Sequence, residues 1–74
     1  MSRNGTRIDA VMGEIKSRIA SRTYTPGARI PSVRAMARAL QVSVSTVLEA
    51  YERLMAEGLL NSRPGSGFYV AGPV

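Results

Sequence analysis

Two short amphipathic segments in the middle of the chain are separated by only three residues. The first covers residues 33–40 and the second residues 44–57, and each follows a serine that is suited to cap a helix. Apolar side chains recur at helical spacing in both segments, at Val33, Met36, Ala37, Leu40, Val47, Ala50, Tyr51 and Leu54. The pattern predicts a helix, a turn at residues 41–43 and a second helix, with Val42 entering the core from within the turn.

A hairpin signal follows the second of these helices. Gly58 is a typical residue for ending a helix, and residues 59–63 and 67–71 have the character of strands. The sequence Pro-Gly-Ser-Gly between them predicts a flexible tip. Because two strands alone are marginal in water, the hairpin must pack on the helices.

The N-terminal part adds one more helix. Its apolar positions follow steps of three and four residues, at Ile8, Val11, Met12, Ile15 and Ile19. We expect a flexible tail over residues 1–5, a cap at Thr6 and a helix over residues 7–21. Residues 6–72 are therefore predicted to form one domain of the mainly α (α+β) class. Its predicted architecture is a winged helix-turn-helix, with three helices followed by a two-stranded β-hairpin wing.

Composition limits the chemistry that this chain can perform. Its 74 residues include no cysteine and no histidine, which excludes disulfides and thiolate or imidazole metal sites. A domain of this size has no room for a deep substrate cavity, and no nucleophile is placed beside a base. We therefore expect a protein that is not an enzyme and that holds no cofactor and no metal in this chain.

The charge balance is strongly basic. The net charge is +5, and all cations except Lys16 are arginines, which bind phosphate and guanine edges bidentately. This composition predicts a polyanionic partner. No apolar run approaches the roughly 20 residues that a membrane span needs, and the first residues lack the apolar segment of a signal peptide. We expect no membrane partner and a location in a reducing bacterial cytoplasm.

The starts of the two central helices carry polar side chains that could meet a DNA duplex. Ser43, Ser45 and Thr46 lie beside free backbone N–H groups, which suit a phosphate, although capping alone explains Ser43 well. Ser32 and Arg34 occupy the start of the preceding helix, which in a helix-turn-helix lies against the strand that flanks the groove. Taken alone, an arginine in this place would simply be solvated.

The hairpin tip is a third candidate for contact with a duplex. It comprises Arg63, Pro64, Gly65, Ser66 and Gly67. Gly65 and Gly67 have no side chains and let the backbone enter a narrow minor groove, and Arg63 supplies the charge that such a groove attracts. A tight turn that needs glycine for positive φ explains the same residues, and both interpretations can hold together.

An apolar pair, Val44 and Leu48, is the fourth candidate. The two residues are one turn apart at the edge of the apolar face, where they most simply complete the core or a dimer contact. The sharper alternative is that one of them meets a thymine methyl in the major groove. A single-strand binder would expose its aromatic residues, whereas Tyr24, Tyr51, Phe68 and Tyr69 are interpreted as packing.

Several of these runs together resemble the GntR family of bacterial transcription regulators. They are Y-x-P-G-x-R-I-P-S-x-R at residues 24–34, V-S-x-S-T-V at residues 42–47, E-G-L at residues 57–59 and R-P-G-S-G at residues 63–67. The resemblance covers about residues 7–71. The sequence A-Y-E-R-L at residues 50–54, together with the R-P-G-S-G wing, looks most like the MocR branch of the family.

The resemblance implies which positions contact DNA. They are Arg34, Ser43, Val44, Ser45, Thr46, Leu48 and the wing at residues 64–66. The family often has arginine where this chain has Val44 and, in several branches, where it has Leu48. This departure puts the usual operator of the family in doubt and leaves more of the affinity to Arg34 and Arg63.

The MocR branch joins such a domain to a large aminotransferase-like domain that binds pyridoxal phosphate. Because these 74 residues contain no such domain, we expect the DNA-binding module of a longer regulator. The resemblance implies a homodimer for the full-length protein, and we expect the isolated domain to be a monomer.

Sequence-specific binding of double-stranded DNA is thus the expected function. The alternative is a winged helix that serves as a protein–protein interaction module, in which Val44 and Leu48 would face the partner. An amphipathic peptide on a membrane surface has only the first helix in its favour.

Overall fold

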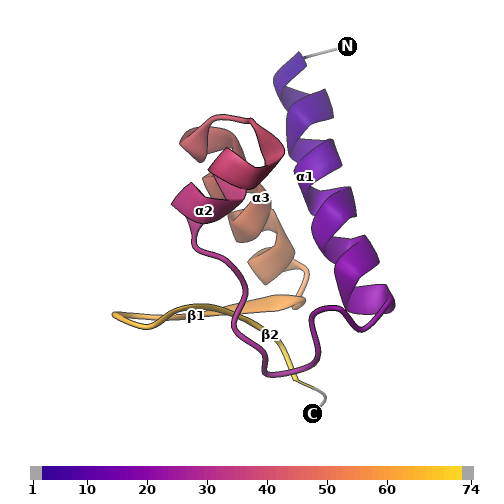
Figure 1. Ribbon diagram of the computed structural model, residues 1–74, viewed down its shortest axis with the longest axis vertical. Coiled ribbons are helices and arrows are strands. Elements are labelled where there is room, and N and C mark those ends of the chain that lie inside the picture. The colour runs from indigo at the N-terminus through magenta and orange to yellow at the C-terminus, as the bar shows by residue number, and fades with distance from the viewer. Residues whose placement is uncertain (1–2, 73–74) are drawn as a thin grey trace.

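Three helices are followed by a two-stranded antiparallel sheet in the computed structural model, which describes residues 3–72 (Figure 1). The helices are α1 (Arg3–Ala20), α2 (Val33–Leu40) and α3 (Val44–Ala56), and the strands are β1 (Leu60–Arg63) and β2 (Gly67–Val70). Helix α1 stands along one side of the molecule, and the tip of the hairpin projects away from it (Figure 1). The expected winged helix-turn-helix architecture is confirmed.

Helix α1 begins earlier than the sequence predicts. It starts at Arg3, so Thr6 lies inside the helix and the predicted cap is wrong. Residues 3–5 of the expected tail are helical, and residues 1–2 lie outside the described part. The helix continues through Gly5 because each added residue gains a hydrogen bond without a new nucleation cost, which offsets the roughly 1 kcal/mol that a glycine costs.

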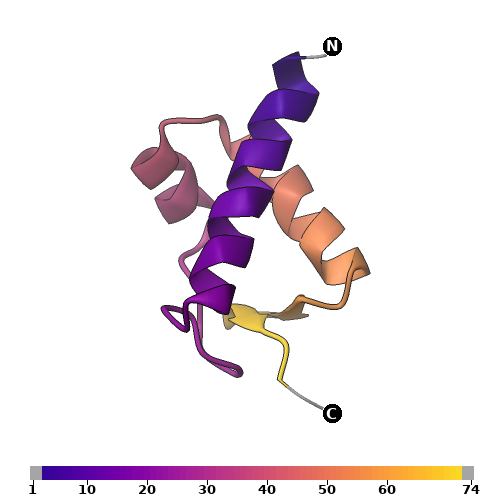
Figure 2. The same ribbon diagram turned by 90° about the vertical axis from the view of Figure 1, so that its right-hand side faces the viewer.

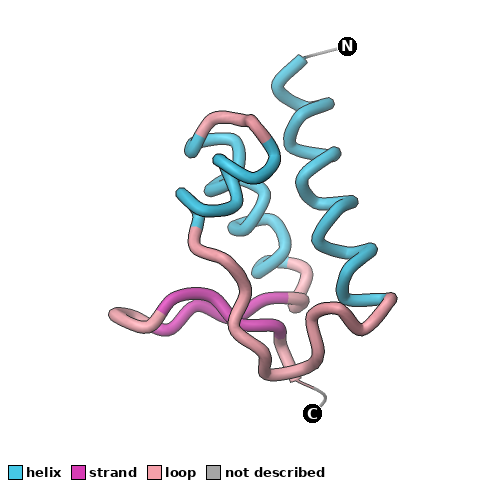
Figure 3. Tube along the Cα trace, in the orientation of Figure 1, coloured by secondary structure: helices cyan, strands magenta, loops and turns pink. Residues whose placement is uncertain are grey.

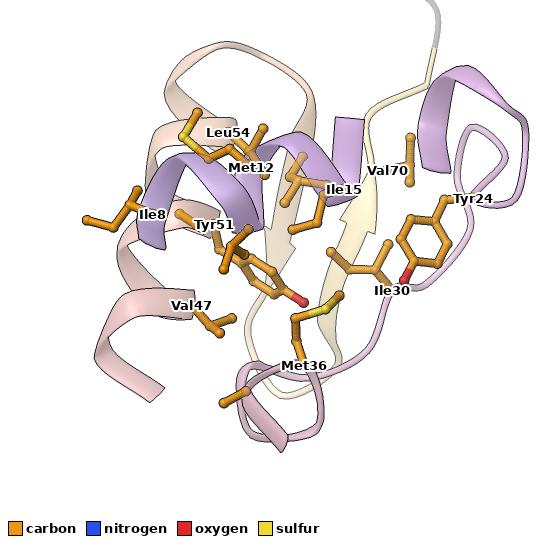
Figure 4. Close-up of a cluster of buried hydrophobic side chains, with 14 residues drawn as sticks. Ile8, Met12, Ile15, Tyr24, Ile30, Met36, Val47, Tyr51, Leu54 and Val70 are labelled. Carbon is orange, nitrogen blue, oxygen red and sulfur yellow. The ribbon is translucent and has the colours of Figure 1, made fainter. Parts of the chain in front are cut away.

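Helix α3 is the centre of the packing. It contacts α1, α2 and β1, and Figure 2 shows α1 in front, with α2 and α3 further back on either side of it. The inner face of α3 consists of side chains that are almost wholly buried, at Val47, Ala50, Tyr51 and Leu54, as predicted. The same core contains the predicted stripe of α1, namely Ile8, Val11, Met12 and Ile15 (Figure 4). Ile19, the last member of that stripe, is only partly buried.

The turn between α2 and α3 has the predicted three residues. Gln41 adopts a left-handed conformation with φ 58°, which costs a residue with a side chain about 1 kcal/mol or more. The N–H groups of Gln41 and Val42 both donate to the carbonyl of Ala37, and they satisfy the end of α2. Val42 is partly buried against the core, so its predicted role is confirmed.

The hairpin is tied to the helices through Tyr51 and Phe68. The two rings meet edge to face with centroids 4.8 Å apart, so the core-side face of β2 packs on α3. The hydroxyl of Tyr51 donates a 2.7 Å hydrogen bond to the carbonyl of Pro31. Burial raises the pKa of Tyr51, so this phenol remains a donor. One buried side chain therefore joins α3, the sheet and the segment that leads into α2, and it lies among the core residues in Figure 4.

An extended segment adds to the sheet beyond the predicted hairpin. Arg29 forms an antiparallel bridge with Tyr69, and the N–H groups of Gly27 and Ile30 donate to the carbonyls of Val70 and Phe68 at 2.9 and 3.0 Å. In Figure 3 this loop segment runs past the two strands before it enters α2. The sequence does not predict this pairing, because the segment has prolines on both sides and no alternating apolar run.

Candidate nucleic-acid interface

The start of α3 is a cluster of hydroxyl groups around one helix cap. The hydroxyl of Ser43 accepts a hydrogen bond from the Thr46 N–H at 3.2 Å, as a cap does. The same oxygen lies 3.2 Å from the hydroxyl of Ser45 and 2.7 Å from that of Thr46. Ser43 and Ser45 are exposed, whereas only 8% of Thr46 is accessible. Two of the three predicted residues are therefore exposed, while Thr46 lies beneath them and holds the cap.

Val44 and Leu48 lie on the outside of α3. Their exposed fractions are 47% and 42%, so the simpler expectation that they complete the core is wrong. The core side of α3 is already filled by Val47 and Tyr51, and none of the described elements covers the side that carries Val44 and Leu48. Of the large apolar residues in the part that the structure describes, these two are the most exposed. They flank the hydroxyl cluster and form one surface with it.

The start of α2 is capped in the same way as that of α3. The hydroxyl of Ser32 accepts from the Ala35 N–H at 3.1 Å, and Arg34 is exposed in the first helical turn. Neither α2 nor α3 has an acidic residue in its first turn, where the helix dipole would favour one. A cation in this place gains nothing from the dipole of its own helix. The positive ends of both helices are thus left open to an anion from outside.

The wing carries its charge at the end of β1. The guanidinium of Arg63 lies over the ring of Tyr69, 5.0 Å from the centroid, which holds it on the hairpin. Residues 63–66 are all exposed. Gly65 and Gly67 have φ values of 77° and 117°, so the turn does require glycine, as one of the two interpretations predicted.

The start of α3 and the tip of the wing occupy different surroundings. The tip of the wing projects away from α1 (Figure 1), whereas Ser43, Ser45 and Thr46 line one hollow together with Arg7 and Ile8 of α1. The aromatic residues do not form an exposed platform, since Tyr24 and Tyr51 are buried and Phe68 and Tyr69 are partly buried. Arg29, which is not among the predicted site residues, lies beside the wing because of its bridge to Tyr69. The sequence signal that could have indicated Arg29 is its position within the run Y-x-P-G-x-R-I-P-S-x-R at residues 24–34.

In this fold the supporting helix α2 is followed by α3, and α3 is followed by a basic hairpin. This order of elements defines the class of winged helix-turn-helix DNA-binding domains, in which the N-terminus of the second of these helices enters a groove. A family model described as bacterial regulatory proteins of the gntR family matches residues 7–70. The chain belongs to this family, and it is a GntR-type DNA-binding domain.

Curated relatives give the same family at the level of sequence. The chain is 40% identical over 58 residues to an uncharacterized HTH-type transcriptional regulator, YdcR, of Escherichia coli K12, covering 78% of this chain and 12% of that protein. It is 54% identical over 43 residues to the probable rhizopine catabolism regulatory protein MocR of Rhizobium meliloti, covering 58% of this chain and 9% of that protein. The chain thus spans about an eighth or less of the length of these relatives.

Solved structures give the same fold. The DNA-binding domain of AraR in complex with operator ORR3 superposes with a TM-score of 0.85 at 32% identity, over 88% of this chain and 78% of that chain. A GntR family transcriptional regulator from Listeria monocytogenes superposes with a TM-score of 0.87 at 27% identity, over 89% and 58% of the two chains. Within residues 3–72, no helix combines the length and the apolar character that crossing a membrane requires.

Proposed function

We propose that this chain binds double-stranded DNA with the start of α3 in the major groove and the wing at the adjacent minor groove. The observation that carries the proposal is the combination of two acid-free helix starts with exposed arginines on α2 and the wing. The structure of the AraR domain with its operator supports this arrangement, since the two folds superpose over most of this chain.

Each residue of the interface has a distinct proposed role. Ser43 and Ser45 offer hydroxyls to a phosphate or a base edge, and the buried Thr46 keeps that cap in shape. Arg34 and Arg63 bind phosphates on either side of α3, and Ser32 holds the helix start that carries Arg34. Val44 and Leu48 meet apolar groups in the groove, of which the thymine methyl is the one that DNA offers. Pro64, Gly65, Ser66 and Gly67 bring the backbone of the wing to the minor groove.

For the whole protein, we propose a longer bacterial regulator of the MocR branch that acts in the cytoplasm. The identity with MocR of Rhizobium meliloti supports this branch. Such a protein has an aminotransferase-like domain for pyridoxal phosphate, which would also join two DNA-binding domains in a homodimer. Joining raises affinity because the second contact becomes intramolecular, so the isolated domain is a weak, monomeric binder.

Titration of the isotope-labelled domain with duplex DNA in dilute buffer tests the proposal. The amide signals of residues 43–46 and 63–67 should shift with both random and selected duplexes, and those at the C-terminal end of α1 should not. If the signals of residues 43–46 and those of residues 63–67 do not shift, the proposal is wrong. Binding of a protein partner through Val44 and Leu48 without any duplex-induced shift would instead favour the protein–protein interaction module.

A further inference from the structure

The outer face of the hairpin carries more than the predicted arginine. Phe68 packs on Tyr51 in the core, so its neighbours Gly67 and Tyr69 belong to the opposite face of β2. Arg63 pairs with Gly67 in the register and therefore shares this face, where its guanidinium covers the ring of Tyr69. Arg29 is bridged to Tyr69 from the other side and lies on the same face. Two arginines thus flank the two outward residues of β2.

The side chain of Arg29 lies directly on the backbone of Gly67. A Cβ atom added to Gly67 would stand 3.2 Å from Nε and 3.4 Å from Nη2 of Arg29. The first distance is shorter than an ordinary van der Waals contact, so Arg29 would have to shift by a few tenths of an ångström to make room for a side chain at Gly67. Gly65 differs in this respect, because a Cβ there would meet nothing within 4 Å. The missing side chain at Gly67 therefore leaves the space in which Arg29 extends along the wing.

No acidic residue competes for Arg29. The chain has no aspartate or glutamate in residues 15–48 or 58–74. The ion pairs of the described residues join Lys16 to Glu57, Arg18 to Glu14 and Arg53 to Glu49, all on α1 and α3 and the residue after α3. Arg29 is exposed and takes part in none of them. An arginine that is packed along a hairpin but free of acids keeps its fork of N–H donors for an anion from outside.

We propose that Arg29 is a further DNA-binding residue, which binds a phosphate beside the minor groove that the wing approaches, and that glycine at residue 67 lets it lie close along the wing. The inference rests on the proposed function and adds a second cation to the wing. Arg63 reaches the duplex from β1, and Arg29 reaches it from the extended segment on the opposite edge of β2.

The first test compares Arg29→Ala with Lys16→Ala by titration of a random duplex at several salt concentrations. Arg29→Ala should weaken binding about tenfold at low salt and reduce the slope of log K against log salt by about 0.9, since one phosphate contact is lost. Lys16→Ala removes the same charge from the α1 side, where it pairs with Glu57 at 3.0 Å, and should leave the slope unchanged. Unchanged slope and affinity for Arg29→Ala would overturn the inference while leaving the proposed function intact. Failure of the unaltered domain to bind any duplex would instead remove the proposed function.

The second test is a double-mutant cycle at the glycine. Gly67→Ala and Gly65→Ala both place a side chain at positive φ, but only the first brings it into tight contact with Arg29. In the unaltered background Gly67→Ala should lower affinity by more than Gly65→Ala, both because of the contact with Arg29 and because φ is 117° at Gly67 and 77° at Gly65. In the Arg29→Ala background this excess should become smaller, since the contact is gone and only the difference in backbone strain remains. Gly65→Ala should have the same effect in both backgrounds. An excess that is undiminished in the Arg29→Ala background would show that Gly67 acts without Arg29 and would overturn that part of the inference.

Discussion

Acids balance the cations on one part of this molecule and are absent from another. Helices α1 and α3, with the residue after α3, contain five cations and all five acids of the chain. The turns, α2, the extended segment and the wing contain five arginines and no acid, at Arg22, Arg29, Arg34, Arg38 and Arg63. The whole net charge of +5 therefore belongs to the second region. We name the first region, which contains the ion pairs of the described residues, the paired region, and the second the unpaired region.

The two regions differ in what their arginines contact. Arg18 donates to Glu14 at 2.6 Å and to the hydroxyl of Tyr24 at 3.1 Å, and the hydrogen bond to Glu14 is the main reason why its pKa is raised. Arg53 is held by Glu49 at 2.8 Å, as the spacing predicts. Such exposed pairs contribute only about 0–1 kcal/mol to stability, but they keep a cation occupied. Position relative to the acids, rather than the number of cations, therefore distinguishes the two regions.

The largest expected effect is the salt dependence of binding. If about six phosphates are neutralised on binding, the slope of log K against log salt is about −5, which weakens binding roughly 10³-fold between 50 and 200 mM salt. Fluorescence anisotropy with a labelled duplex measures this slope. A slope near zero would break the comparison, since the unpaired charges would then have no part in binding.

A single arginine from each region provides the next test. Arg34→Ala should weaken binding about tenfold, because a charge-assisted hydrogen bond to phosphate contributes roughly 1.5–3 kcal/mol. Arg53→Ala removes the same charge from the paired region and should change affinity about twofold or less. Both variants are compared by anisotropy on random and selected duplexes. If Arg34→Ala weakens only the selected duplex, Arg34 reads a base instead of gripping a phosphate.

The apolar pair beside the unpaired region should produce a smaller effect. Replacing a contacted thymine by uracil removes one methyl group, so affinity should fall about fourfold if Val44 or Leu48 buries it, on the basis of roughly 0.8 kcal/mol per buried carbon. Uracil is substituted at one position of a selected site at a time. The absence of any methyl dependence would end this role for the pair.

The smallest effect is expected at Glu52, an exposed acid of α3 that takes part in none of the ion pairs of the described residues. Glu52→Ala should change the free energy of unfolding by about 0.5 kcal/mol or less and should leave DNA affinity almost unaltered. Thermal unfolding and anisotropy measure the two quantities. A marked gain in affinity would show that the acids of α3 repel the duplex and that the two regions are not independent.

Most of the fold could be predicted from local signals. The apolar spacing and the capping serines give α2 with the observed bounds, and α3 with its observed start, because helical periodicity and caps act within a few residues. The start of α1 could not be predicted in this way, since the chain there has no decisive cap and the helix simply propagates to Arg3. The wing was predicted, but its pairing with Arg29 depends on a contact between residues far apart in the chain.

The candidate site shows the same division. Residue types indicated Ser43, Ser45, Arg34 and the wing, and the structure places all of these at the surface. Burial depended on what surrounds each residue, which explains why Thr46 lies beneath the cap and why Val44 and Leu48 are exposed. Val44 and Leu48 lie at the edge of the apolar face of α3, where the helical period alone does not distinguish a buried from an exposed side chain.

By itself, the order of residues determined the three amphipathic helices, the glycine turn of the wing, the excess of arginine and the family. These properties follow from short-range periodicity, backbone preferences and composition, which require no knowledge of distant neighbours. The tertiary structure decided which cations face an acid, which face of α3 remains open, and that Arg29 meets Gly67 across the sheet. Contacts between distant segments exist only after the chain has packed, so no local pattern encodes them.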